Sequence, residues 1–114
     1  MPNYIISFNQ GDMKFPEEDL PQVAHDAHEV LRAAKAAGAW IFGGGFDGFN
    51  PTVVTEEGVV TQGPLAQSDV VLGGFSILKL SSIEEAHTWA AKFAKACRCP
   101  QEVREFMLDE ESTN

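Results

Sequence analysis

The chain has 114 residues, of which 44% are hydrophobic and 22% are charged, and it carries a formal charge of -9. This length and composition predict one globular domain with one core. The excess of acidic side chains repels phosphate backbones and anionic lipid surfaces, so we expect no nucleic-acid or membrane partner. No apolar run is long enough to span a bilayer, and MPNYIISF lacks the basic region of a signal peptide, so we expect a cytoplasmic protein.

The first half of the chain predicts a strand, a helix and a second strand. NYIISF is rich in β-branched and aromatic residues, as strands are. A helix is predicted from Pro21 to the stop at Gly38, with Asp19 as its N-cap. Its apolar stripe, at helical spacing, consists of Val23, Ala27, Val30, Leu31 and Ala34. AWIFGGGF then predicts a strand that runs into glycines, without the following helix that a phosphate-binding loop requires.

The second half predicts a hairpin, a strand, a helix and a last strand. Two β-branched runs, 52–55 and 59–61, flank a Glu-Glu-Gly turn, which is typical of a β-hairpin. VLGGFSILKL predicts the next strand. SSIEEAHTWAAKFAKA predicts a helix whose Ser82 and Glu85 form a capping box. EVREFML predicts the last strand, and residues 109–114 form an acidic tail that we expect to be frayed.

Cys97 and Cys99 are separated by one residue. A bridge across such a short span has poor geometry, and a single CxC pair is a weak metal signal. We therefore expect two reduced thiols near a helix end, with no metal site and no cofactor.

The order of elements predicts an α+β fold of the split βαβ, ferredoxin-like type with an inserted hairpin, spanning residues 1–108. Both helices should cover one face of an antiparallel sheet. The strands, however, carry large apolar residues at odd and at even positions, which point to opposite faces of the sheet. Examples are the neighbours Ile5 and Ile6, and the neighbours Ile77 and Leu78. A face in contact with water would be polar, so this pattern predicts a homodimer that covers the second face.

Residues across the whole domain resemble the YCII-related family in its DGPF branch. The run from Thr61 to Ser68, followed by Leu72-Gly73-Gly74-Phe75, resembles the Asp-Gly-Pro-Phe motif and the Gly-Gly-aromatic strand after it. Ala37-Gly38-Ala39 with the later glycines, the second-helix run from Ser82 to Ala90, and Glu102-Val103-Arg104 also resemble the family's pattern.

The resemblance implies a ferredoxin-like, dimeric α+β barrel. It implies no fixed chemistry, because most members have no demonstrated activity. Relatives in the YCII branch use a histidine–aspartate pair on small molecules, and members of the DGPF branch are often encoded beside sigma factors of the extracytoplasmic-function type. This chain departs from the motif, because Gln62, Leu65 and Gln67 stand where the family has Asp, Phe and Glu.

The candidate catalytic residues are His28 and a carboxylate. His28 lies on the flank of the first helix's apolar stripe, close to the register of the YCII-branch histidine, and imidazole is a natural proton shuttle. Asp69 after the Gly-Pro motif and Asp47 after the glycine run are the candidate acids, and each is also an ordinary turn residue. An amide such as Gln62 cannot act as a general base.

The candidate ligand-binding residues lie on three segments. Gln62, Gly63 and Pro64 either line a pocket or only shape the exit of the hairpin. Arg104 either holds a carboxylate ligand or pairs with Glu102 at a dimer seam. Trp40, with Phe42 and Phe46, lines an aromatic pocket or belongs to the core.

Three hypotheses follow from the sequence. The first is a small-molecule enzyme with His28 and one acid in a dimeric barrel. The second is a ligand-binding or sensory module without catalysis, which the two glutamines of the motif favour. The third, suggested by the resemblance alone, is a regulatory protein linked to a sigma factor.

Overall fold

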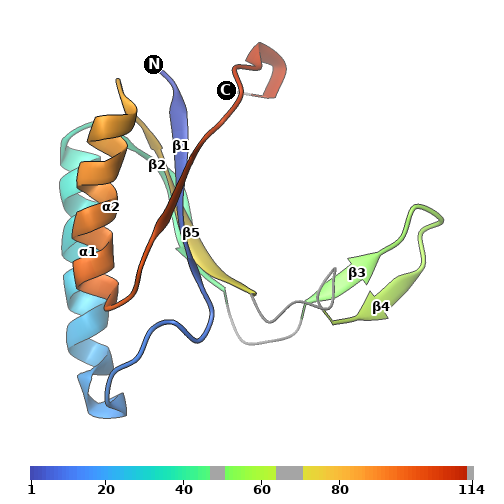
Figure 1. The fold of residues 1–114 in the computed structure, drawn as a ribbon, viewed down its shortest axis with the longest axis horizontal. Helices are drawn as coiled ribbons and strands as arrows, with labels where there is room; N and C mark the ends of the chain where they lie inside the picture. The colour runs from blue at the N-terminus through green and yellow to red at the C-terminus, as the bar shows by residue number, and fades with distance from the viewer. Residues whose placement is uncertain (47–50, 64–70, 113–114) are drawn as a thin grey trace.

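The computed structural model describes residues 1–46, 51–63 and 71–112 as an α+β fold with a helix layer and a sheet layer (Figure 1). In chain order the helices and strands are β1 (Asn3–Asn9), α1 (Leu20–Ala36), β2 (Trp40–Gly45), β3 (Thr52–Val54), β4 (Val60–Gln62), β5 (Leu72–Lys79), α2 (Ile83–Cys97) and β6 (Glu102–Glu105). Short 3-10 turns, η1 (Glu17–Asp19) and η2 (Glu110–Ser112), precede α1 and follow β6. The predicted order of strands and helices is confirmed.

The main sheet is antiparallel, with the strand order β2-β5-β1-β6. Its register pairs Tyr4 with Leu78 and Ile5 with Ile77 in the two central strands. Because successive residues of a strand point to opposite faces, Tyr4 and Leu78 lie on one face of the sheet. Ile5 and Ile77 lie on the other face.

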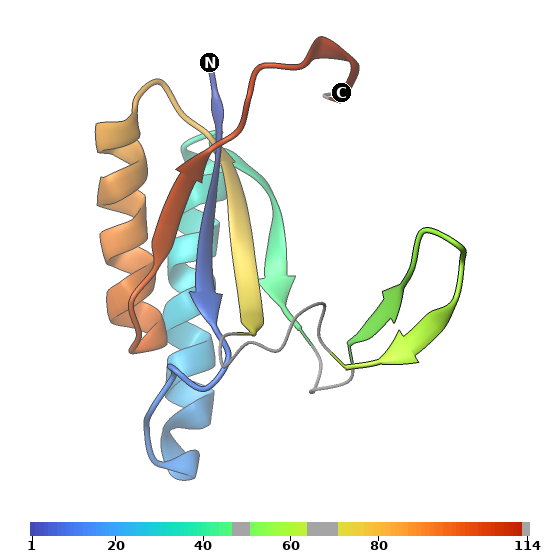
Figure 2. The same ribbon diagram turned by 45° about the vertical axis from the view of Figure 1, so that its right-hand side comes forward.

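Both helices pack against the face that carries Tyr4 and Leu78 (Figures 1 and 2). Tyr4, Ile6 and Leu78 are each at most 1% exposed. Alanines on the helices let the two layers approach closely, and the buried ones include Ala34, Ala86 and Ala90. Among the described residues, no helix combines the length and apolar character needed to cross a membrane.

The two helices begin with different caps. At α2 the Ser82 hydroxyl accepts a hydrogen bond from the backbone N–H of Glu85 at 3.2 Å. The Glu85 carboxylate reaches back one residue further than in an ordinary capping box, to the N–H of Ser81 at 3.1 Å. Asp19 is at the N-cap position of α1, but its side chain makes no capping hydrogen bond, so the predicted side-chain cap is wrong. Pro21 in the first turn removes one donor that would need such a cap.

Arg98 ends α2 and ties it to α1. Its backbone takes the left-handed conformation, with φ of 60°, which is unusual for a residue with a side chain. Its guanidinium donates to the carbonyl groups of Lys95 and Ala96 and pairs with the Asp26 carboxylate of α1 at 3.0 Å. Hydrogen bonds from Gln22 and from Arg98 lower the pKa of Asp26. Arg98 therefore closes the helix end and links the two helices where they diverge from the sheet.

Strands β3 and β4 form a separate two-stranded sheet, which we call the hairpin arm (residues 51–63). Its turn uses Gly58 at a φ of +86°, and its base is closed by a hydrogen bond from the N–H of Gly63 to the carbonyl of Pro51 at 2.9 Å. The predicted hairpin is thus confirmed. The arm projects on the side of the sheet opposite to the helices (Figures 1 and 2).

A register shift in β2 separates two aromatic residues that are only two positions apart. Trp40 is paired with Leu78, whereas Phe42 is paired with Ile77, the very next residue of β5 towards its start. The extra residue is a β-bulge, which reverses the side on which the following residues point. Trp40 therefore lies on the helix side, and Phe42 lies on the opposite face.

Gly43 follows the bulge and is required sterically. A Cβ at this position would lie 2.4 Å from the backbone oxygen of Phe75 and 3.0 Å from the Trp40 ring. Two residues on, in the same strand, a Cβ at Gly45 would meet only the Gly73 oxygen at 3.9 Å.

We expect Gly43→Ala to lower the free energy of unfolding by about 1–3 kcal/mol, because the added methyl forces β2 and β5 apart. Gly45→Ala is the matched control and should change it by less than about 1 kcal/mol. Urea unfolding followed by circular dichroism measures both. Equal stability of the two variants would contradict the packing described for β2.

Candidate functional site

The sheet face that the helices leave uncovered, which we call the open face, is the main candidate site. One row of paired residues runs across it from Phe42 through Ile77 and Ile5 to Arg104. The next row consists of Gly44, Phe75, Ser7 and Glu102. The face is therefore apolar on the β2 and β5 side and ionic on the β6 edge.

Three phenylalanine rings gather at the apolar side of the open face. The Phe75 ring lies 6.4 Å from Phe42 and 5.9 Å from Phe46, measured between centroids. Phe42 is 63% exposed and Phe46 is 54% exposed. Gly44 lies between them in β2, and a Cβ there would meet no described atom within 4 Å. The missing side chain leaves open space beside the rings.

Two polar residues, Asn3 and Ser7, lie on the open face. Ser7 is only 8% exposed and is the buried polar residue of the core region. The side-chain oxygen of Asn3 is buried and has no hydrogen-bond partner within the described ranges. A buried acceptor without a donor is costly.

Arg104 and Glu102 lie on the open face, at its β6 edge, and both are exposed. In the described part of the chain neither forms an ion pair. The exposed β6 edge is accessible both to a ligand and to a second copy. The position of Arg104 is therefore consistent with either role considered from the sequence, ligand binding or a dimer seam.

The other predicted site residues are not gathered around Arg104. His28 is exposed on α1, in the helix layer, so the sheet lies between it and the open face. Gln62 and Gly63 lie on the hairpin arm, away from α1 (Figure 1). Gly63 has a φ of +104°, which agrees with a backbone role in shaping the arm. The predicted residues Pro64 and Asp69, and the alternative acid Asp47, lie outside the described residues.

Trp40 belongs to the core. Its ring packs 6.5 Å from Phe93 of α2, and it contacts the buried cluster between the sheet and the helices. It therefore does not share a surface with Phe42 and Phe46, in contrast to the aromatic pocket considered from the sequence. The β-bulge after Trp40 is the physical reason.

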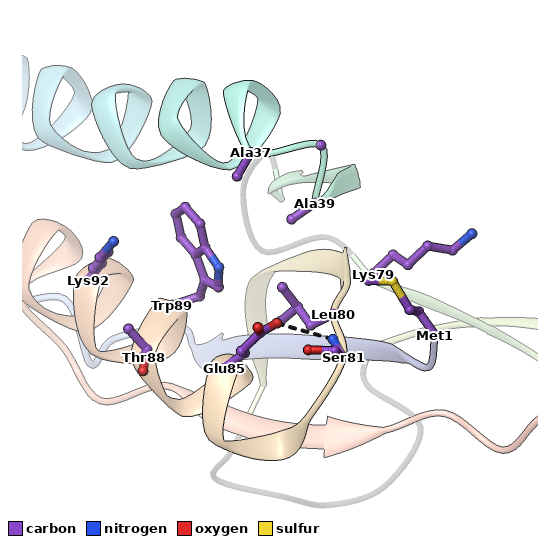
Figure 3. A pocket seen from close by; sticks show the side chains of 11 residues that line it. Met1, Ala37, Ala39, Lys79, Leu80, Ser81, Glu85, Thr88, Trp89 and Lys92 are labelled. Carbon is purple, nitrogen blue, oxygen red and sulfur yellow. Dashed lines mark hydrogen bonds between the residues drawn. The ribbon is translucent and has the colours of Figure 1, made fainter.

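A groove of about 500 Å³ lies between the end of α1 and the start of α2 (Figure 3). Its walls include Ala39, Leu80, Glu85 and Trp89. The Glu85 carboxylate is already engaged with the N–H of Ser81, and the Trp89 ring is covered by the Lys92 ammonium at 4.4 Å from its centroid. Because its main polar groups serve the helix cap, we assign this groove to the fold rather than to ligand binding.

Both cysteines are free thiols and are buried at the end of α2, as expected from the sequence. Burial, with smaller contributions from the nearby Cys97 and Asp12, raises the pKa of Cys99 from 9.0 to about 11. Burial also raises the pKa of Cys97. These thiols stay protonated at neutral pH, which makes them poor nucleophiles and metal ligands.

No protein-family model matches the chain, and no curated protein sequence matches it. Function therefore has to be argued from the geometry of the open face. Sequence reasoning missed Asn3 and Ser7 in that face, because a small polar residue within an apolar strand gives no signal of its own.

The raised thiol pKa values predict how stability depends on pH. The unfolded chain releases its thiol protons near pH 9.0, whereas folded Cys99 retains its proton up to about pH 11. The free energy of unfolding should therefore be fully maintained below pH 9 and decrease as the pH rises towards 11. Urea titrations across this range measure the decrease, and Cys99→Ala should make it shallower. An unchanged slope in the variant would contradict the assignment to this thiol.

Proposed function

We propose that the chain is a small-molecule-binding subunit of a homodimer, in which the open faces of two copies face each other and enclose the ligand. The observation that carries this proposal is the exposed apolar open face. A sheet in contact with water on one side normally alternates apolar and polar residues, and the Phe42–Ile77–Ile5 row does not. Large exposed apolar patches mark interaction sites.

The surface area and the shape support a second copy as the cover. The accessible surface is 8236 Å². A compact monomer of 12.4 kDa exposes about 6,100 Å², which is about 2,100 Å² less. Obligate homodimers bury roughly 2,000–5,000 Å² over both subunits, so the excess lies within the roughly 1,000–2,500 Å² that one subunit of such a dimer contributes. The radius of gyration of 15.6 Å also exceeds the value of about 13 Å that is usual for this length.

The topology supports a ferredoxin-like fold and the dimeric α+β barrel. The order β2-β5-β1-β6 brings the two halves of a split βαβ unit together, with the hairpin arm inserted between β2 and β5. We therefore assign the chain to the YCII-related class, DGPF branch, as a proposal that rests on the resemblance of its motifs. A cytoplasmic location and a link to a sigma factor rest on the sequence and on that resemblance alone.

The open face favours a ligand with an aromatic or apolar body and a negative group. Ligand sites are mostly apolar, with a few polar groups that fix orientation. The Phe42, Phe46 and Phe75 rings and the open space at Gly44 supply the apolar part. Arg104 is the cation at the other end of the Phe42 row and is able to hold a carboxylate through two hydrogen bonds.

The geometry favours a ligand-binding protein over an enzyme that uses His28 and an acid. His28 is separated from the open face by the sheet, and within the described part of the chain no carboxylate makes an ion pair with it. The comparable pair elsewhere on α1 is His25 with Glu29 at 3.1 Å, and it is exposed on both sides.

A first experiment tests the dimer. Ile77→Glu places a carboxylate in the middle of the open face, where it would be buried in the dimer without a partner. We expect it to raise the dissociation constant of the dimer by about a hundredfold or more. Leu20→Glu makes the same change at an exposed residue, 53% accessible, in the first turn of α1, and should leave the dimer intact. Sedimentation velocity measures both. Equal association of the two variants would exclude the open face as the interface.

A second experiment tests the ligand class. Aromatic carboxylates such as benzoate should raise the melting temperature of the wild-type protein, because a ligand that binds only the native state stabilises it. Arg104→Gln should weaken this binding by about tenfold or more, since it removes a charge-assisted bond. Glu102→Gln, next to it on the same edge, is the control. Equal binding of benzyl alcohol would show that the negative group is not recognised.

A further inference from the structure

The hairpin arm has an apolar side that no described part of its own chain covers. Val54 and Val60 are paired across β3 and β4 and therefore point to the same side of the arm. They are 62% and 61% exposed. On the opposite side, Val53 is half-buried and is paired with Thr61. A two-stranded hairpin without further packing is only marginally stable in water, so the arm needs a surface to rest on.

The arm and the open face lie on the same side of the molecule. Figures 1 and 2 show the arm standing clear of the sheet on the side away from the helices. It is not hydrogen-bonded to the main sheet in the described part of the chain. One chain thus offers two uncovered apolar surfaces, the Val54–Val60 side of the arm and the phenylalanine side of the open face.

We propose that the hairpin arm of each copy packs against one end of the other copy's open face, beside the contact between the two sheets. The inference rests on the proposed homodimer and adds a contact that the sheet faces alone would not make. In a two-fold symmetric dimer, a surface that fits another surface of the same chain forms the contact twice. The occupant of the arm's apolar side is therefore a second copy of this chain.

The length of the arm suits this contact. The run from Pro51 to Glu57 spans about 20 Å when extended, whereas the outer strands of a four-stranded sheet are about 14 Å apart. An arm of this length can cross one end of the partner's sheet, beside the region where the two open faces meet.

The charges at the tip of the arm also complement those on the other copy. The turn carries Glu56 and Glu57, both exposed. The open face carries Arg104, and the neighbouring row ends at Lys79, which is paired with Asn3. In the described ranges none of these four side chains forms an ion pair. The two acids at the end of the arm thus complement Lys79 at the rim of the other copy's face, where charge fixes orientation, while Arg104 is left to the ligand.

Two neighbouring residues of β4 provide a matched test. Val60→Asp and Thr61→Asp add the same charge on opposite sides of the arm. We expect Val60→Asp to raise the dissociation constant of the dimer by about tenfold or more, and Thr61→Asp to change it by less than about twofold. Sedimentation velocity measures both constants, with circular dichroism to check the fold. Equal effects of the two substitutions would overturn the inference.

A second variant removes most of the arm, so that its result does not depend on whether a charged substitution within the arm disturbs the fold. Replacing residues 53–61 by Asn-Gly joins Thr52 to Gln62 through a two-residue turn. We expect the same weakening of the dimer, and an unchanged dissociation constant would overturn the inference.

The inference and the proposed dimer fail in different ways. If the wild-type chain is monomeric, both fall. If it is a dimer that Ile77→Glu dissociates, while the arm variants leave it intact, the dimer stands and only the role of the arm is excluded.

Discussion

The structure depends on one constraint: a four-stranded sheet has two faces, and the two helices of this chain cover only one of them. The covered face holds Tyr4, Ile6 and Leu78, which are almost inaccessible. The open face holds residues that are no less apolar, in Phe42, Phe75 and Ile77. The described residues place no further layer over the open face, and we propose that a second copy covers it.

This constraint also decides where a ligand site can lie. The helix side of the sheet is filled by alanines and aromatic rings, and the groove at the end of α1 uses its carboxylate for the cap of α2. The open face offers exposed rings, open space at Gly44, an Asn3 oxygen without a partner among the described residues, and the Arg104 guanidinium. A cavity between two such faces would be walled by apolar residues and oriented by a few polar groups, as ligand sites commonly are.

Much of the fold was predictable from the sequence, because its signals are local. The stripe through Val23 and Ala34, the Ser82–Glu85 cap and the turn at Gly58 all depend on residues that are close along the chain. The site was less predictable, because the face on which a residue lies depends on register between distant strands. Strand alternation alone predicts that Trp40 and Phe42, two positions apart, point to the same side of the sheet. One β-bulge between them places them on opposite sides. For the same reason the sequence did not separate His28 from Arg104.

The most direct measurement is the mass of the wild-type protein in solution, by sedimentation equilibrium from nanomolar to micromolar concentration. Two copies of a 12.4 kDa chain give a mass of about 25 kDa, and burial of an apolar face of this size should hold them together in the nanomolar range. The account predicts this dimer. A monomer of 12.4 kDa at micromolar concentration would contradict it, because the open face would then remain in water.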